Sequence, residues 1–392
     1  MINFFFSDDV RREPFLWYDQ VRSASPVLRD ASSDTWILLD YASVAHAMDD
    51  HATFSSRVTR PGGCAPEWLV FLDLPRYARL RTIVNRAFAP RAITALAPRI
   101  EAISRELLDS LRHRDEIDLV ADYAEPLPVR VIAEMMGIPL EGQATFGGWS
   151  RTIENLSCAI TGSDSGAYAV REYATVRGDI VRYLADMIAA RRASPAGDLL
   201  STLACSEIRG EGLSDEEIVG FFQLLLSAAT ETTTNLISNA MLCFMDYPDQ
   251  LARLRGSPDA MGTAIEEVMR FRSPEQIIFR QTTRDVKLHG RTIPADRFVL
   301  LMLGSANRDP AYFRCAHHFD VTRSPNPHIA FGHGIHSCLG AALARAEARV
   351  ALPQLLSRLR RFEPATNEPW VPREALHVHG PSALPLRVEW AG

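Results

Sequence analysis

Apolar residues follow a helical period through most of the chain. Between residues 91 and 113 they recur at every third or fourth position, at Ile93, Leu96, Ile100, Ile103, Leu107 and Leu111. This spacing is typical of an amphipathic helix. Similar patterns predict further helices at 75–88, 125–136, 143–160, 168–192, 198–206, 258–270 and 341–360. The chain is therefore expected to be mainly helical.

Short apolar runs bounded by turn residues predict a smaller β region. They occur at 26–28, 36–39, 276–279, 286–289, 293–296 and 298–300, with a short helix expected at 41–48. The strands that follow Pro274 lie between two long helical segments. We therefore expect a mainly α fold with a smaller β region, in the α+β class.

One predicted helix is unusually long. Ser214 followed by Glu217 forms a capping box, and the helical pattern then continues to Pro248. At about 1.5 Å per residue this helix is roughly 50 Å long. Because it is apolar on most faces, we expect it to pass through the middle of the protein.

The interior of that helix holds an anomaly, the sequence Ala228-Ala229-Thr230-Glu231-Thr232-Thr233-Thr234. Threonine is a poor interior residue because its hydroxyl competes for backbone carbonyls. One interpretation is a core helix whose hydroxyls bond to carbonyls four residues earlier, with Glu231 in an ion pair. The other is a site that handles protons.

Length, composition and charge exclude several classes of protein. The 392 residues are 47% hydrophobic, with no flexible linker, so we expect one domain spanning 1–392. Formal net charge is −6, which argues against a nucleic-acid partner. The amino terminus has only a short Phe run, so we expect no membrane anchor and a cytoplasmic location. Six scattered cysteines suggest neither a disulfide framework nor paired zinc ligands.

The segment Phe331-Gly-His-Gly-Ile-His-Ser-Cys338-Leu-Gly340 stands directly before a predicted helix. A helix N-terminus lowers the pKa of a thiol, so Cys338 is expected to be poised as a thiolate. Three chemical interpretations remain open: a zinc site with His333 and His336, a Cys–His nucleophile, and haem-thiolate ligation. A buried, inert cysteine is the fourth alternative.

Glu267 and Arg270 lie three residues apart on the predicted helix 258–270. Residues with this spacing are neighbours on one helix face. Taken alone, the pair is typical of a solvated surface ion pair.

Together these segments resemble the cytochrome P-450 family of the soluble bacterial type. Phe331-x-x-Gly334-x-x-x-Cys338-x-Gly340 matches the family's cysteine loop in every fixed position, and Glu267-x-x-Arg270 matches its Glu-x-x-Arg pair. The segment 228–232 falls where the family's oxygen-activating sequence lies. The resemblance extends from about residue 73 to the turn near residue 382, which is nearly the whole chain.

The resemblance implies a haem b cofactor, iron protoporphyrin IX, with Cys338 as the ligand of the iron. Phe331 and Gly340 would pack near the sulfur, and Ala228 would contact the haem from the long helix. The haem propionates would be held by Arg81, Arg280 and His336, together with Tyr77, where relatives often have histidine. Glu267, Arg270 and Arg323 would form a buried structural network, which replaces the surface-pair interpretation.

On the opposite side of the haem, Glu231 and Thr232 match the acid and alcohol that deliver protons during oxygen activation. Dioxygen is then the co-substrate, and the expected reaction is monooxygenation, by hydroxylation or epoxidation. Ala229 stands where many relatives have glycine. The alternatives are a haem-thiolate enzyme of another class, such as a peroxygenase or a C–C or C–O coupling catalyst, and a non-catalytic haem protein.

By the same resemblance, electrons come from a separate ferredoxin and an NAD(P)H-dependent ferredoxin reductase. Arginines expected near the face that would receive a ferredoxin are Arg76, Arg79, Arg86, Arg345 and Arg349. We expect a monomer. Substrate-facing positions implied by the resemblance are mostly apolar, namely Trp68, Phe71, Leu224, Ser227, Gln276, Ile277, Ile278 and Ser382. A hydrophobic small molecule is the expected substrate, with Gln276 as a candidate polar anchor.

Overall fold

The computed structural model describes residues 7–31, 33–60, 63–64, 68–139, 143–161, 164–208 and 210–391. Its helices are α2 (Asp8–Arg12), α3 (Phe15–Ala24), α4 (Tyr41–Asp49), α5 (Arg76–Ala87), α6 (Pro90–Leu111), α7 (Pro126–Met135), α8 (Gln143–Glu154), α9 (Asp164–Ala193), α10 (Leu199–Cys205), α11 (Asp215–Asp246), α12 (Pro248–Gly256), α13 (Met261–Phe271), α14 (Leu303–Ala306) and α15 (Ala341–Arg358). Single 3-10 turns include Leu69–Phe71, Asn155–Thr161, Pro258–Ala260 and Gly334–His336, and Val120–Ala124 is a π-helical turn. The chain is mainly helical, as its periodicity predicts.

The strands form one larger sheet and several small ones. The five-stranded sheet has the order β1 (Val27–Asp30), β2 (Thr35–Leu38), β12 (Phe298–Met302), β9 (Ile277–Thr282) and β3 (Phe54–Ser55). Strands β2 and β12 are parallel, with Val299 opposite Trp36, whereas the other neighbours are antiparallel. A second sheet has the order β13 (Leu359–Pro364), β14 (Pro385–Trp390) and β6 (Glu116–Asp118). Two-stranded ribbons are β10 (Val286–Leu288) with β11 (Arg291–Ile293), β4 (Thr59–Arg60) with β5 (Gly63–Cys64), and β7 (Glu207–Ile208) with β8 (Glu211–Gly212).

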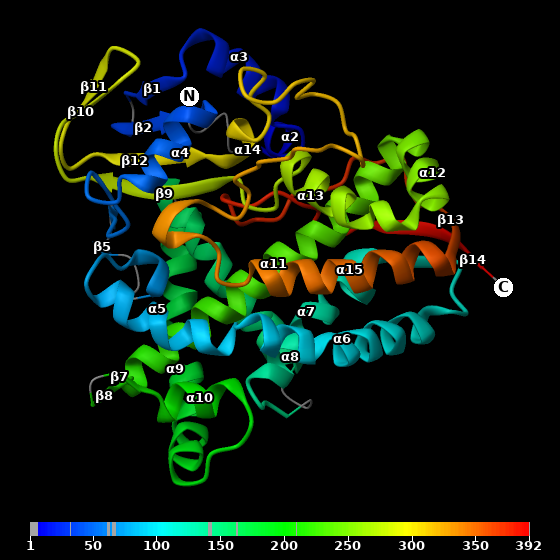
Figure 1. The fold of residues 1–392 in the computed structure, drawn as a ribbon, viewed down its shortest axis with the longest axis horizontal. Coiled ribbons are helices and arrows are strands. Elements are labelled where there is room, and N and C mark those ends of the chain that lie inside the picture. The colour runs from blue at the N-terminus through cyan, green and yellow to red at the C-terminus, as the bar shows by residue number, and fades with distance from the viewer. Residues whose placement is uncertain are drawn as a thin grey trace.

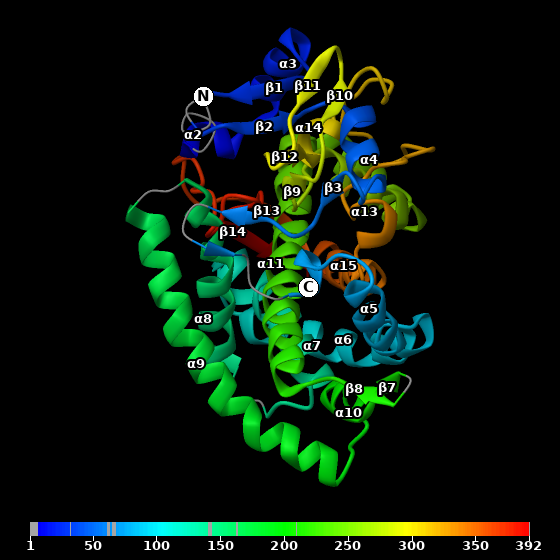
Figure 2. The same cartoon turned by 90° about the vertical axis from the view of Figure 1, so that its left-hand side faces the viewer.

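Helix α11 passes through the middle of the helical part of the protein, with the five-stranded sheet beyond one end (Figure 1). Figure 2 shows α8 and α9 on one side of α11, and α5 and α15 on the other. The capping box that starts α11 is formed as predicted, with the Glu217 N–H donating to Ser214 Oγ over 3.1 Å. The side chains of α11 are almost all buried between Ile218 and Phe244.

The exceptions on α11 form a stripe. Leu224, Ser227, Ala228, Ala229 and Thr232 are partly or fully accessible in the centre of this otherwise buried helix. The stripe is therefore a surface inside the helical core, and it coincides with the anomalous threonine-rich sequence.

The sequence prediction omits several short elements, both near the ends of the chain and in its interior, where α12, α14 and β6 are examples. Helices α2 and α3 were not predicted, because both are short. Pro248 ends α11 but also begins α12, at the first helical position where proline is tolerated. The last predicted helix stops at Arg358, where β13 begins. That the chain forms one domain stays a prediction.

In the part of the chain that the structure describes, no helix has the length and apolar character needed to cross a lipid bilayer. The amino-terminal Phe run, residues 4–6, lies outside the described residues.

Candidate active site

The accessible stripe of α11 lies beside the cysteine loop, residues 331–340. Both views of the fold place the segment before α15 next to the middle of α11 (Figures 1 and 2). Phe331, Ile335 and Leu339 of the loop pack against the same apolar core as Leu224 and Ala229 of α11. Although the loop adjoins this core, the side chain of Cys338 is accessible. The two accessible surfaces define the candidate site.

Two glycines give the cysteine loop its path. Gly332 and Gly334 have φ angles of +70° and +69°, a region that side chains with a Cβ rarely adopt. A Cβ at Gly334 would lie only 2.8 Å from the Met48 carbonyl oxygen. The turn closes where the Cys338 N–H donates to the Phe331 carbonyl over 2.8 Å. The loop therefore needs glycine at both positions in order to present Cys338.

That Cys338 is poised as a thiolate stays a prediction. Helix α15 begins at Ala341, three residues after the cysteine. Burial raises the pKa of the Cys338 thiol, and this outweighs the Gly340 backbone N–H and the nearby Arg81, which lower it. The protein alone thus stabilises the thiol, so ionisation needs a stronger partner such as a metal ion.

The zinc interpretation gains no support from the loop histidines. His333 Nε2 lies 3.3 Å from Asp49 Oδ2, and His336 Nε2 lies 3.0 Å from Ser56 Oγ. Across the described ranges, no three His, Cys, Asp or Glu side chains are grouped as metal ligands would be.

Three nitrogen-bearing side chains converge beside the cysteine loop. Arg81, on α5, donates to the Ser337 carbonyl over 2.9 Å. Arg280, on β9, is 5% exposed and donates to the Phe279 carbonyl over 2.8 Å. Burial lowers the pKa of Arg280 to about 10, while burial and nearby Arg280 lower the pKa of His336 to about 3. His336 is therefore neutral near pH 7, whereas both arginines are cationic.

Tyr77 is next to this group but acts on the loop. Its hydroxyl donates to the Ile335 carbonyl over 2.6 Å, and its ring lies 4.1 Å from the His336 ring. A phenol has one proton to donate. In this structure the Tyr77 proton is donated to the cysteine loop, and a hydrogen bond from Tyr77 to a propionate stays a prediction.

Arg345, on α15, supports the cysteine loop through Phe331. Its guanidinium stacks over the Phe331 ring at 4.3 Å and makes two hydrogen bonds of 2.7 Å to Glu266. Glu266 also meets His328 Nε2 at 3.0 Å. Burial opposes the shift, but hydrogen bonds from Arg345 and His328 lower the pKa of Glu266 to about 2. The charge of Arg345 is therefore balanced locally.

Glu267 and Arg270 are fully buried, so the surface-pair interpretation is excluded. Two hydrogen bonds of 2.8 Å join them. Arg323 adds contacts of 3.0 and 3.1 Å to the same carboxylate. Arg270 also donates to the carbonyls of Asn307, Ala316 and His318, which belong to the segment leading to the cysteine loop. The three side chains form the network that the resemblance implies.

Glu231 and Thr232 occupy different faces of α11. The Thr232 hydroxyl donates to the Ala228 carbonyl over 2.6 Å, and the residue belongs to the accessible stripe. Glu231 is 4% exposed, and within the described chain its Oε1 has no hydrogen-bond partner. Burial and the Glu154 carboxylate raise the pKa of Glu231 well above its usual value. Glu231 is therefore a buried carboxyl whose protonated form is favoured, one residue before the accessible Thr232.

Two of the expected substrate-facing residues are placed elsewhere. Gln276 is 3% exposed; its amide accepts a hydrogen bond from Tyr18 at 2.6 Å and donates one to the Ser273 carbonyl at 2.7 Å. The expected polar anchor is thus wrong, since both ends of the amide are already used. Ile277 is also misplaced, because it packs in a separate core that includes Tyr18. Alternation along β9 turns Ile278 the other way, toward Gly332.

The remaining substrate candidates keep their status as predictions. Trp68 Nε1 donates to Gln223 Oε1 over 3.1 Å, and its ring stacks on Phe71 at 6.1 Å. Leu224 and Ser227 belong to the accessible stripe. The Ser382 hydroxyl donates to the Val371 carbonyl over 3.0 Å.

Sequence reasoning overlooked two buried polar residues near α11. Gln223 holds both Trp68 and Tyr173, at 3.1 and 3.0 Å. Glu154 ends α8 and influences Glu231. In the sequence, each is a lone polar residue on a predicted helix, and such residues are usually solvated; their burial depends on how the helices pack.

A family model described as Cytochrome P450 matches residues 260–382. The cyclomarin C epoxidase CymV of Salinispora arenicola is 35% identical over 386 residues, covering 97% of this chain and 97% of that protein. The chain belongs to the cytochrome P450 family. A vitamin D(3) 25-hydroxylase of Pseudonocardia autotrophica is 36% identical over 395 residues, covering 97% of this chain and 95% of that protein. The crystal structure of CYP109E1 from Bacillus megaterium in complex with testosterone matches with a TM-score of 0.90 and 36% identity, covering 97% of this chain and 99% of that one.

This cytochrome P450 is accordingly a monooxygenase of a haem-dependent family. The residues present fit a haem. In the described ranges, no carboxylate forms an ion pair with Arg81 or Arg280, so two cations are available for the two carboxylates of the group. Across from the accessible Cys338 lies the accessible stripe of α11. The donor set therefore suits an anionic, thiolate-ligated cofactor.

Proposed function

We propose that this cytochrome P450 inserts one atom of dioxygen into a hydrophobic small molecule, by hydroxylation or epoxidation, with haem b as its cofactor. The observation that carries the proposal is the accessible stripe of α11. It presents the hydroxyl side chains of Ser227 and Thr232 beside apolar Leu224 and Ala228. The buried carboxyl of Glu231 directly precedes Thr232 in the chain.

Cys338 would bind the iron, while Arg81, Arg280 and His336 would hold the propionates. When bound, the haem supplies the oxygen chemistry. A neutral His336 that accepts from Ser56 through Nε2 can donate through Nδ1, so all three side chains would act as donors. Because Arg280 is buried, its pairing with a carboxylate would be stronger than at a surface.

Thr232 and Glu231 would manage protons. Burial and the Glu154 carboxylate raise the pKa of Glu231, which favours the protonated form of its carboxyl. Thr232 donates its own proton to the Ala228 carbonyl, so its oxygen remains free to accept. An adjacent donor and acceptor of this kind would allow a proton to move from the buried carboxyl toward the accessible face.

A hydrophobic substrate of moderate size is supported by the apolar lining and by two relatives. Leu224, Ala228 and Phe71 offer apolar surface, whereas Gln276 is occupied in the core. One relative is a vitamin D(3) 25-hydroxylase, and the CYP109E1 crystal structure is a complex with testosterone. Discrimination among such molecules would then depend mainly on shape.

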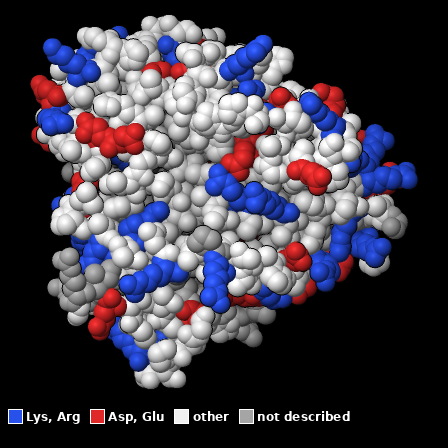
Figure 3. Space-filling model, viewed as in Figure 1, with Lys and Arg blue, Asp and Glu red and all other residues white. Residues whose placement is uncertain are grey.

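Electrons would come from a separate ferredoxin and an NAD(P)H-dependent reductase. Figure 3, which views the face on which α15 lies, shows basic side chains in separate groups among acidic ones. Arg79 and Arg345 are paired with Glu217 and Glu266, at 2.5 and 2.7 Å. Among the described residues, Arg86 and Arg349 are exposed and form no ion pair, so these two are the better candidates for contact with an acidic partner.

The test is the coupling of NAD(P)H consumption to product in Thr232→Ala, measured with a surrogate ferredoxin system and a hydrophobic probe substrate. We expect coupling to fall about tenfold or more, with hydrogen peroxide released instead. Thr233→Ala is the matched control, because Thr233 is 2% exposed and lies off the accessible stripe. Equal coupling in both variants would overturn the proposal.

A further inference from the structure

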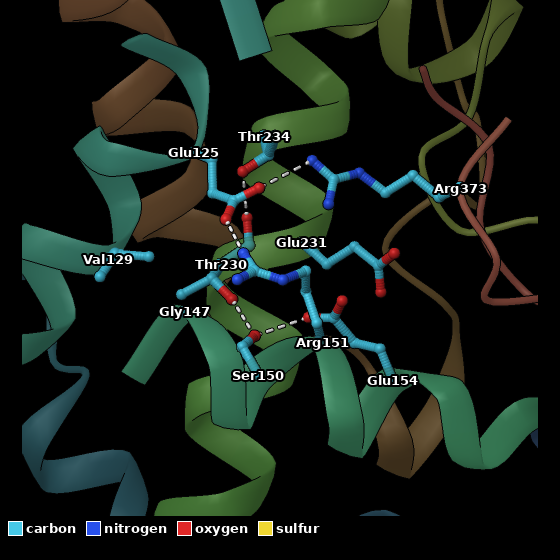
Figure 4. A pocket seen from close by; sticks show the side chains of 10 residues that line it. All are labelled: Glu125, Val129, Gly147, Ser150, Arg151, Glu154, Thr230, Glu231, Thr234 and Arg373. Carbon is cyan, nitrogen blue, oxygen red and sulfur yellow. Dashed lines mark hydrogen bonds and ion pairs between the residues drawn. The ribbon is translucent and has the colours of Figure 1, made fainter. Parts of the chain in front are cut away.

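A small polar cavity lies behind Glu231, on the side of α11 away from the cysteine loop. It offers about 10 Å³ to the centre of a water molecule. That volume suits roughly one water. Figure 4 shows the carboxyl groups of Glu125, Glu154 and Glu231 and the guanidinium groups of Arg151 and Arg373 around it. Of these five groups, only Glu231 has a role by the family resemblance.

Glu154 and Glu231 are each 4% exposed, and their carboxyl groups point into the same part of the cavity (Figure 4). Ser150 Oγ lies 2.6 Å from Glu154 Oε1 and 2.6 Å from Thr230 Oγ1. Thr230 in turn donates to the Leu226 carbonyl over 2.6 Å. If Glu154 is protonated, its O–H donates to Ser150, the Ser150 hydroxyl donates to Thr230, and the Thr230 hydroxyl donates to the Leu226 carbonyl. If Glu154 is ionised, the Ser150 hydroxyl turns and donates to its carboxylate. Both protonation states are therefore satisfied, which is what a proton relay requires.

The surrounding charges favour a single proton on the pair. Glu125 lies 2.5 Å from Arg151 and 3.3 Å from Arg373, which leaves one positive charge in excess. One ionised carboxyl of the pair balances that charge, whereas two would leave a buried negative charge.

Two more charged groups face the pair from other elements, and neither changes this balance. Arg11 of α2 is paired with Asp8 at 3.6 Å. Burial raises the pKa of Glu275 well above its usual value, which favours the neutral form of that carboxyl. Burial also raises the pKa of Glu154, in keeping with a proton shared between two carboxyl groups.

The cavity is connected to solvent at one end and to the accessible stripe at the other. The side chains of Glu125 and Arg151 are 23% and 55% exposed. At the inner end, Glu231 is followed by the accessible Thr232. Solvent, the cavity, Glu154 and Glu231 therefore follow one another from the surface inward, and Thr232, the next residue of the chain, belongs to the accessible stripe.

We propose that Glu154 shares one proton with Glu231 and reloads Glu231 after each proton delivery. The inference rests on the proposed function of Glu231. After the shared proton leaves through Glu231, both carboxyl groups are ionised; Glu154 then takes one proton from solvent through the cavity water and shares it with Glu231, so the pair again holds a single proton. Only O–H bonds form and break, and no electron moves. Glu154 is thus a positioning residue that acts through Glu231.

The first test needs no turnover: infrared spectra of the resting, haem-loaded protein in the region of protonated carboxyl groups. In Glu154→Gln and in Glu231→Gln alike, the infrared signal of one protonated carboxyl group should disappear, because the carboxyl group that remains in the pair then ionises. The double variant should remove no more than either single variant. Additive losses of two carboxyl groups would overturn the shared proton.

The second test is the pH profile and the solvent isotope effect of turnover. Glu154→Gln should lower the rate about tenfold to a hundredfold, increase the isotope effect and move the alkaline loss of activity to lower pH. Glu154→Asp should recover much of the rate, and Glu134→Gln, a half-exposed carboxyl paired with Arg99, is the control. An unchanged profile in Glu154→Gln, with Thr232→Ala still uncoupled, would refute the relay and leave the proposed function standing. If Thr232→Ala is also without effect, the proposed function itself fails.

Discussion

Glu267→Gln should destabilise the protein far more than the same change at the neighbouring Glu266. The Glu267 carboxylate is fully buried and accepts hydrogen bonds from Arg270, Arg323, the Asp320 N–H and Asn326, at 2.8 to 3.2 Å. Glutamine preserves the shape but removes the charge that compensates two guanidinium groups, one of them 0% exposed.

Removing one partner of a buried ion pair costs about 3–5 kcal/mol. Since folded proteins are stable by only about 5–15 kcal/mol, the expected loss is a large fraction of the total. Glu266 has a partly exposed partner, because the side chain of Arg345 is 32% exposed. Surface and half-exposed pairs contribute about 1 kcal/mol or less, so Glu266→Gln should have a much smaller effect.

The assay is urea unfolding of the haem-loaded protein, followed by tryptophan fluorescence and by the haem absorption band. Glu267→Gln should lower the midpoint strongly with a similar slope, and it should release haem at lower urea because Arg270 holds the segment before the cysteine loop. Equal midpoints for Glu267→Gln and Glu266→Gln would refute the reasoning that burial determines the cost.

Three further predictions follow from individual side chains. Gln276→Leu should lower the free energy of unfolding in urea by about 1–3 kcal/mol, since it leaves the buried partners of the amide unpaired. The spin-state response to a hydrophobic probe should stay unchanged, and altered probe affinity with normal stability would contradict this. Burial raises the pKa of Glu347 to about 8, so the native state keeps a proton that the unfolded chain loses near pH 4.5. Between these two pH values the free energy of unfolding therefore falls by about 1.4 kcal/mol per pH unit. Glu347→Gln should therefore gain stability relative to the natural protein as pH rises from 5 to 8, and a constant difference would be inconsistent with the buried acid. Charge reversal at Arg86 or Arg349 should slow reduction by an acidic ferredoxin and weaken its salt dependence, measured by stopped flow, whereas an unchanged rate would place the docking surface elsewhere.

The sequence predicted those parts of the fold that depend on local pattern. The capping box at Ser214 and the apolar run that follows define α11, and both are formed. The glycine spacing around Cys338 likewise predicts a special turn, which the structure has at Gly332 and Gly334. Short elements such as α3 could not be predicted, because their stability comes from contacts with distant segments.

Side-chain orientation was less accessible to sequence reasoning. Ile277 and Ile278 looked equivalent, but strand alternation places only one of them toward the cysteine loop. The expected thiolate at Cys338 was derived from helix position alone, whereas α15 begins at Ala341, three residues after the cysteine. Glu154 was overlooked because its importance comes from packing against α11, which no local pattern contains.

The role of Cys338 as the iron ligand is tested most directly by the absorption spectrum of the reduced protein with carbon monoxide, compared with Cys338→Ser. We expect the natural protein to show the red-shifted Soret band from which the family takes its name, and Cys338→Ser to lose it. Cys205→Ser, which changes an exposed cysteine on α10, should retain the band. Persistence of the band in Cys338→Ser, or failure of the natural protein to bind haem, would contradict the account.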